Sequence, residues 1–214
     1  MYNAYNEKKW AFVSDYARID VIYEYGGIYL DTDVELVKSL DSLLDAGLYA
    51  GWESRDPIQD LYDLEYENSV NFGLGYGACR RHPVLKSLLE IYDELSFYNA
   101  DGSLNLIACP KYQTKVLKSY GLDTSQRTLQ KINDIVIYPE DYFSPKSQIT
   151  GKIDLTENTY SIHHFSMSWV DNSARKFGFL EQKLIVRYGY PLGHNLARIL
   201  SAPSKISRRL KRRK

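Results

Sequence analysis

Two aspartates, Asp31 and Asp33, stand one residue apart where an apolar segment gives way to a polar one. Side chains two residues apart in an extended segment project to the same side, so both carboxylates can address one hard cation or its water shell. Oxygen ligands of this kind suit Mn²⁺ or Mg²⁺ that bridges to a diphosphate. The alternative is a polar turn after a strand, because the chain has sixteen aspartates and a short Asp-x-Asp spacing also arises by chance.

Further polar residues could join this pair. Asp15 and Arg18 are three residues apart in an otherwise largely apolar segment, which places them on one face of a helix. They could hold a polar ligand, or they could form a mutual buried ion pair. Near the other end of the chain lie four residues that could close the same site with an imidazole and an indole: His163, His164, Ser168 and Trp169. Paired histidines on a strand can also be one buried and one exposed residue without a ligand role.

The elements that must position these residues follow from the residue pattern. Residues 8–25 lack Gly and Pro, and we expect a largely buried helix that ends at Gly26 and Gly27. Residues 28–30 fit a short buried strand, and residues 31–33 the point where it emerges. Later segments predict strands within 49–54, 70–78, 134–139 and 159–169, and helices within 82–95 and 111–121. Alternation of this kind is typical of an α/β layer fold.

Composition is that of a globular protein with an uneven charge distribution. The 214 residues are 44% hydrophobic and 25% charged, which suits one compact domain. We expect this domain to span residues 1–190. Two cysteines without a metal-binding spacing indicate reduced thiols, and the polar first residues lack the apolar segment of a signal peptide. A cytoplasmic protein is expected, peripheral at the inner face of the cell membrane.

Residues 191–214 are predicted to be an amphipathic, basic tail. The last ten residues contain seven Lys and Arg and no acidic residue, whereas residues 1–204 have 20 basic against 27 acidic residues. Such a cluster is attracted to anionic lipid by about 1 kcal/mol per basic residue near the surface. No aromatic residue is interleaved with these charges and the rest of the chain is net acidic, which disfavours nucleic acid as the partner. A solvated, disordered terminus is the remaining alternative.

Several segments, in order, resemble one known family. Residues 14–35, "SDYARIDVIYEYGGIYLDTDVE", closely resemble the DXD-containing sugar-binding region of bacterial capsular and surface-polysaccharide glycosyltransferases and yeast initiation-specific mannosyltransferases, and more distantly of clostridial glucosylating toxins. Residues 70–78, 82–86, 137–145 and 156–169 resemble later blocks of the bacterial branch. The resemblance implies a GT-A fold, a Rossmann-like mixed sheet flanked by helices. It also implies that this fold is N-terminally shortened here, without the first strand region that grips the nucleotide base.

The resemblance assigns roles to individual residues. Asp15 and Arg18 would hold hydroxyls of the donor sugar, with Tyr29 packed nearby and Asn71 facing the same sugar. Asp31 would reach the ribose and, through water, the metal, and Asp33 would bind the metal directly. His164, five residues before Trp169, is preferred to His163 as a further metal ligand. Ser168 and Trp169 would contact the diphosphate or cover the site.

The expected function is therefore metal-dependent transfer of a hexose, with retained configuration, from a UDP- or GDP-sugar. The acceptor would be a saccharide or a lipid-linked molecule in surface or capsular polysaccharide synthesis, and the cofactor Mn²⁺ or Mg²⁺. Asp15, Arg18, Asp31 and Asp33 are the expected catalytic residues. One alternative is a catalytically silent subunit or fragment that keeps the fold. Another is a metal-dependent nucleotide-sugar hydrolase or a plain cation-binding module.

Overall fold

A computed structural model describes residues 2–62, 68–166 and 172–211, and only the backbone of residues 57, 60 and 203–211. The chain divides into two compact units. Unit 1 comprises residues 1–55, 66–146 and 153–165, and unit 2 comprises residues 56–65, 147–152 and 166–214. Every described residue to which the sequence assigned chemistry lies in unit 1. The predicted domain boundary between residues 190 and 191 stays a prediction.

Unit 1 is built on a five-stranded mixed sheet with the strand order β1-β4-β3-β6-β5. The central strands β3 and β6 are parallel, and all other neighbours in the sheet are antiparallel. In chain order these strands are β1 (Gly27–Tyr29), β3 (Leu48–Gly51), β4 (Tyr76–Ala78), β5 (Gln130–Ile132) and β6 (Ile135–Tyr138). A separate antiparallel ribbon pairs β2 (Val34–Leu36) with β7 (Ser161–His163).

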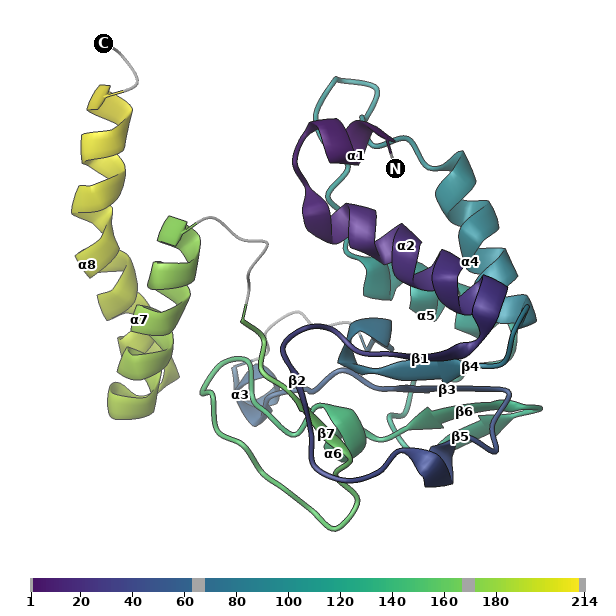
Figure 1. Cartoon of the computed structure of the whole chain (residues 1–214). Helices are drawn as coiled ribbons and strands as arrows, with labels where there is room; N and C mark the ends of the chain where they lie inside the picture. Colours follow the sequence, from purple (N-terminus) through teal and green to yellow (C-terminus); the bar gives the residue numbers. More distant parts are fainter. Residues whose placement is uncertain (1, 63–67, 167–171, 212–214) are drawn as a thin grey trace. The chain divides into compact units, whose positions relative to one another are not determined.

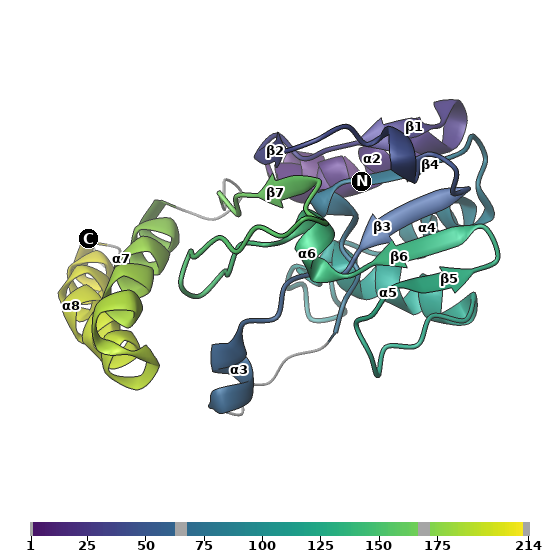
Figure 2. The same ribbon diagram turned by 90° about the horizontal axis from the view of Figure 1, so that it is seen from below.

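Three helices cover one face of this sheet (Figure 1). They are α2 (Trp10–Tyr25), α4 (Pro83–Glu94) and α5 (Cys109–Ser119), and α1 (Tyr2–Asn6) precedes them. The core beneath them is fully apolar where Ile19, Leu85 and Leu117 meet the strands. The shorter α6 (Glu140–Phe143) follows β6 (Figure 2). Its Phe143 belongs to a second apolar cluster with Tyr49 and Leu74. This architecture confirms the predicted α/β class and is consistent with a GT-A-like fold.

The junction between α2 and β1 matches the prediction for the helix but not for the strand. Gly26 ends α2 with a φ of 70°, and its N–H donates to the Ile22 carbonyl at 2.8 Å. A side chain at Gly26 would approach the Arg80 backbone nitrogen to 2.9 Å. The expected burial of the strand is wrong, because β1 is an edge strand and Ile28 is 39% exposed.

The glycine-rich segment 70–78 is only partly a strand. A short 3₁₀ helix, η2 (Phe72–Leu74), precedes β4, and the Asn71 side chain caps it by accepting from the Gly73 N–H at 2.7 Å. Asn favours such local bonds to the backbone over continued strand pairing. A further 3₁₀ turn, η1 (Asp41–Leu43), lies between β2 and β3.

Unit 2 contains α3 (Pro57–Leu61), α7 (Asn172–Tyr188) and α8 (Tyr190–Lys211). Helices α7 and α8 form an antiparallel hairpin that turns at Gly189, whose φ is 81°. Most of the predicted tail is thus helical. Within the part of the chain that the structure describes, no helix is long and apolar enough to cross a membrane.

His82 caps α4 with its ring. Nδ1 accepts from the Val84 N–H at 3.2 Å, and Nε2 lies 3.5 Å from the Asp134 carboxylate. The ring is buried, and burial lowers the pKa of His82 below its ordinary 6.5 although Asp134 acts in the opposite direction. The cap therefore requires the neutral ring.

This cap predicts a loss of stability in mild acid. The unfolded chain binds the His82 proton near pH 6.5 and the folded chain only at lower pH, so the free energy of unfolding falls as pH drops below about 6.5. The slope from this group is at most about 1.4 kcal/mol per pH unit. His82→Asn keeps a cap that does not titrate, and urea unfolding across this range should show a shallower pH dependence. Equal slopes in both proteins would contradict the assignment.

Candidate functional site

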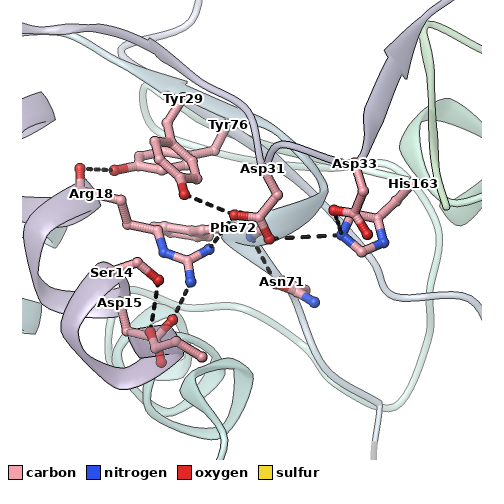
Figure 3. Close-up of polar contacts among 12 residues, drawn as sticks. Ser14, Asp15, Arg18, Tyr29, Asp31, Asp33, Asn71, Phe72, Tyr76 and His163 are labelled. Carbon is pink, nitrogen blue, oxygen red and sulfur yellow. Dashed lines mark hydrogen bonds and ion pairs between the residues drawn. The ribbon is translucent and has the colours of Figure 1, made fainter. Parts of the chain in front are cut away.

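Arg18 lies at the centre of a polar cluster in unit 1 (Figure 3). Its guanidinium pairs with the Asp15 carboxylate one helical turn earlier, and its Nη1 lies 3.2 Å from Oδ1 of Asp31. Asp15 and Arg18 are both buried, and the Arg18 carbonyl accepts from the Tyr76 hydroxyl at 2.8 Å. The helix is thereby fastened to the turn that carries the aspartates and to β4.

Asp31 is held by three neighbours. The Tyr29 hydroxyl donates to Oδ1 at 2.8 Å, Arg18 contacts the same oxygen, and Nε2 of His163 lies 3.7 Å from Oδ2. Burial by itself would raise the pKa of Asp31, but the contact with His163, the charge of Arg18 and the hydrogen bond from Tyr29 outweigh it and lower the pKa. Asp31 is therefore a carboxylate at neutral pH.

The two aspartates converge through a turn rather than through an extended segment. The Val34 N–H donates to the Asp31 carbonyl at 3.1 Å, which closes a turn over residues 31–34. The expectation that the pair shares one side of a strand is therefore wrong in its geometry. The turn nevertheless brings the two carboxylates close enough for one residue, His163, to contact both of them.

His163 completes a three-residue cluster. The pairing of β2 with β7 sets His163 opposite Val34, directly after Asp33. Its Nε2 lies 3.3 Å from Oδ1 of Asp33, and one ligand atom from each of Asp31, Asp33 and His163 lies within 4.8 Å of the others. Two carboxylates and an imidazole at this spacing could hold a divalent cation.

The structure brings His163, and not the predicted His164, to the aspartates. Neighbouring residues of a strand project to opposite sides. The His164 ring lies 2.8 Å from the Glu35 carboxylate and is more than a third exposed. The backbone N–H of His164 donates to the Asp33 carbonyl at 2.9 Å. The preference for His164 as a ligand thus finds no support in this geometry.

Gly73 leaves the space into which these polar groups face. A methyl group at this position would come to 2.7 Å from Oδ2 of Asp31, 3.0 Å from Oδ1 of Asn71 and 3.1 Å from Nη1 of Arg18. Any side chain here would therefore displace the carboxylate or the guanidinium. Only glycine is compatible with this arrangement.

Asn71 borders the same space but has protein partners. Its Oδ1 accepts from Gly73, and its Nδ2 donates to Glu53 at 3.2 Å. Glu53 also accepts from the Ser69 hydroxyl at 3.0 Å. This is the local bridge to the backbone that an Asn beside Gly often makes, and contact with a sugar stays a prediction.

Asp15 is embedded in a similar way. Burial raises the pKa of Asp15, although the charge of Arg18 and a hydrogen bond with the Cys109 thiol oppose this change. The mutual ion pair considered as an alternative to ligand binding does form. Arg18 also pairs with Asp31, and this second ion pair links the helix to the candidate metal cluster. The remaining predicted residues, Ser168 and Trp169, lie outside the described residues.

Two features of this site were not predicted as such. His163 was considered but ranked second, since its position depends on the pairing of residues 34–36 with 161–163. Gly73 lies in a segment whose alternating glycines indicate close approach of backbone or ligand, but the sequence does not say which glycine meets the aspartates.

Comparison with known proteins bears on the first part of the chain. Residues 1–49 match the family model described as a glycosyltransferase sugar-binding region containing DXD motif. This match supports the broad DXD-containing glycosyltransferase family and, with it, a sugar-transfer function. Members of that family usually bind a divalent metal. Neither the curated proteins nor the solved structures contain a significant match to the chain.

Substitution of Gly73 tests the geometry of the site. Gly73→Ala should displace Asp31 and weaken binding of Mn²⁺ together with UDP or GDP by about 10- to 100-fold, the usual effect of disturbing groups that orient metal ligands. Isothermal titration calorimetry measures this affinity. Gly47→Ala is the matched control, since the three atoms nearest to its added methyl group all belong to the side chain of Asp134, outside this site. Unchanged affinity in the Gly73 variant would show that Asp31 is not part of the binding site.

Proposed function

We propose that this chain transfers a hexose from a UDP- or GDP-sugar to a saccharide or lipid-linked acceptor, with Mn²⁺ or Mg²⁺ as cofactor. The broad function rests on the family match over residues 1–49. The observation that carries the finer proposal is the convergence of Asp31, Asp33 and His163 beside Arg18. An acidic cluster adjoining a buried guanidinium is suited to a metal diphosphate, because the carboxylates would hold the cation and the guanidinium would contact the anionic diphosphate.

The donor set fits a divalent metal. Two carboxylates, one with a lowered pKa, and one imidazole are typical ligands of Mn²⁺, while Mg²⁺ prefers oxygen. We propose Asp31, Asp33 and His163 as the ligands, with His163 in place of His164. A cation bound there would supply positive charge close to the departing diphosphate.

The protein's own groups complete the electrostatics. Breaking the bond between sugar and diphosphate builds negative charge on the leaving group, and the Arg18 guanidinium is already fixed beside the aspartates to oppose it. In a glycosidase, two carboxylates act from opposite sides of the scissile bond. Asp31 and Asp33 instead contact the same histidine, so both would lie on one side of the scissile bond. This favours a role at the leaving group.

The donor sugar would contact Asp15, Arg18, Tyr29 and Asn71 in this proposal, and Ser168 and Trp169 would reach the diphosphate. Retention of configuration, a hexose as the transferred sugar and a role in surface or capsular polysaccharide synthesis come from the family resemblance.

We place the protein in the cytoplasm at the inner face of the membrane, where residues 191–214 would attach it to anionic lipid. A lipid-linked acceptor would make that location useful. Release of sugar to water instead of to an acceptor would favour the hydrolase alternative.

The metal site makes the first functional prediction. Mn²⁺ with UDP or GDP should raise the melting temperature by about 5–10 °C at a hundredfold excess over Kd, since this excess contributes about 2.7 kcal/mol. Asp33→Asn removes one ligand charge and should abolish the shift. Differential scanning fluorimetry measures it, and the exposed Asp20 on α2 offers Asp20→Asn as a control.

The neighbouring histidines supply a matched pair for the same assay. His163→Gln should abolish the Mn²⁺-dependent shift, and His164→Gln should keep it. The reverse result would restore His164 as the ligand and contradict the contacts of His163. If Asp33→Asn responds like the wild type, the metal site is elsewhere.

Asp15 tests the sugar contact. Asp15→Asn should abolish transfer or sugar-nucleotide hydrolysis and leave most of the folding stability, if the carboxylate binds the sugar. If Asp15 serves only as the partner of Arg18, its removal should cost about 3–5 kcal/mol of unfolding free energy. Urea unfolding and turnover of the folded fraction separate the two cases. A large loss of stability with normal turnover would overturn the assignment.

A further inference from the structure

The α7–α8 hairpin packs through small residues. A side chain at Gly193 would lie 2.5 Å from the Ile185 backbone, and Ala197, one turn later on α8, is fully buried. Ile185 on α7 is buried as well. One face of α8, marked by Gly193 and Ala197, is thus occupied by α7.

A second face of α8 carries large aliphatic side chains that face solvent. Leu192, Ile199 and Leu200 are 53%, 66% and 60% exposed. Their spacing of i, i+7 and i+8 puts them on one side of a helix, and Leu196 at i+4 lies between them. These four residues are called the leucine face below. A contiguous exposed apolar face of this kind marks a contact with another molecule or a membrane.

The charge of the hairpin indicates which kind of contact. Residues 172–214 contain twelve Lys and Arg but one acidic residue, Glu181. Glu181 is engaged inside the hairpin, where its carboxylate lies 2.5 Å from Nδ1 of His194. The hairpin is therefore strongly cationic, and its complement is an anionic surface that accepts aliphatic groups.

We propose that the α7–α8 hairpin docks on an anionic lipid surface with the leucine face of α8 inserted at the interface. A helix with an aliphatic face and many basic residues binds in this way, lying in the plane of the headgroups. No described helix is apolar enough to span a bilayer, so the hairpin lies on the surface. The proposal deepens the membrane location given under the proposed function, and it does not depend on the transferase activity.

The other elements of unit 2 do not oppose this placement. Residues 56–65 contain four acidic residues. The ring centroids of Tyr62 and Tyr190 are 5.1 Å apart, so Tyr62, in the described part of this segment, lies beside the start of α8. The cluster of basic residues begins fifteen positions later, at Lys205, about 22 Å further along the helix at 1.5 Å per residue. Tyr62 and the basic end of α8 are thus well separated.

Flotation of the full chain with vesicles tests the proposal. The wild type should float with phosphatidylcholine vesicles that contain phosphatidylglycerol, and should not float with pure phosphatidylcholine. The double variant Ile199→Gln/Leu200→Gln keeps every charge and removes apolar groups, and it should bind anionic vesicles about tenfold more weakly because less apolar area leaves water. Truncation after Ala202, which removes seven basic residues, should abolish binding.

Controls separate insertion from charge attraction. Val21 on α2 in unit 1 is 52% exposed, so Val21→Gln makes a similar change outside the hairpin and should bind like the wild type. Circular dichroism of the double variant checks that helix content is kept. Leu200→Trp should show a blue-shifted emission with anionic vesicles only.

Each outcome is decisive for the inference. If the double variant floats as well as the wild type, charge alone holds the chain at the lipid and the leucine face does not insert. If the wild type fails to float at low salt, or if pure phosphatidylcholine is bound equally, the hairpin does not recognise anionic lipid. Loss of transferase activity with intact flotation would count against the proposed function and leave this inference standing.

Discussion

The ion pair between Arg18 and Asp31 is the contact on which the candidate site depends. It joins α2 to the turn after β1, two elements that the Gly26–Gly27 junction sets side by side. Arg18 is buried and Asp31 partly buried, so their pairing is little screened by water, and loss of either charge would remove this link between the helix and the turn. The helix and the turn are therefore held in one relative position, and Asp31 presents its second oxygen toward His163.

This arrangement shifts the pKa values of the two carboxylates that share Arg18, Asp15 and Asp31, in opposite directions. Asp15 is the more deeply buried of the two, and burial raises its pKa despite the guanidinium. Asp31 also has the contact with His163 and the hydrogen bond from Tyr29, and its pKa is lowered. Arg18 thus pairs with one carboxylate within the helix and, together with His163 and Tyr29, keeps the other ionised at the edge of the candidate metal cluster. Gly73 makes this possible by leaving the space beside Asp31 and Arg18 free of side chain.

The sequence predicted what local chemistry determines. The apolar run before Gly26 predicted α2, and the pattern after Pro83 predicted α4. The Asp pair lies in the turn at which His163 joins it in the candidate metal cluster. The exposure of β1 and the choice between His163 and His164 were not predictable in this way. Both depend on which strands pair, because β1 takes its place at the sheet edge by pairing with residues 76–78, and β2 pairs with residues 161–163.

The C-terminal region shows the same limit. Its basic charge and amphipathic pattern are visible in the sequence. The hairpin itself depends on the close fit of Gly193 against the backbone at Ile185, and a small residue in a sequence does not reveal its partner. Composition therefore indicated a tail, whereas packing makes a second helical unit with one apolar face left uncovered.

Anomalous diffraction from crystals grown with Mn²⁺ and a nucleoside diphosphate would test the central claim most directly. A site organised by Arg18 and Asp31 requires one manganese peak in contact with Asp31, Asp33 and His163, with the diphosphate extending toward Arg18. A peak at His164 and Glu35, or a diphosphate bound with no metal at the aspartates, would contradict the account.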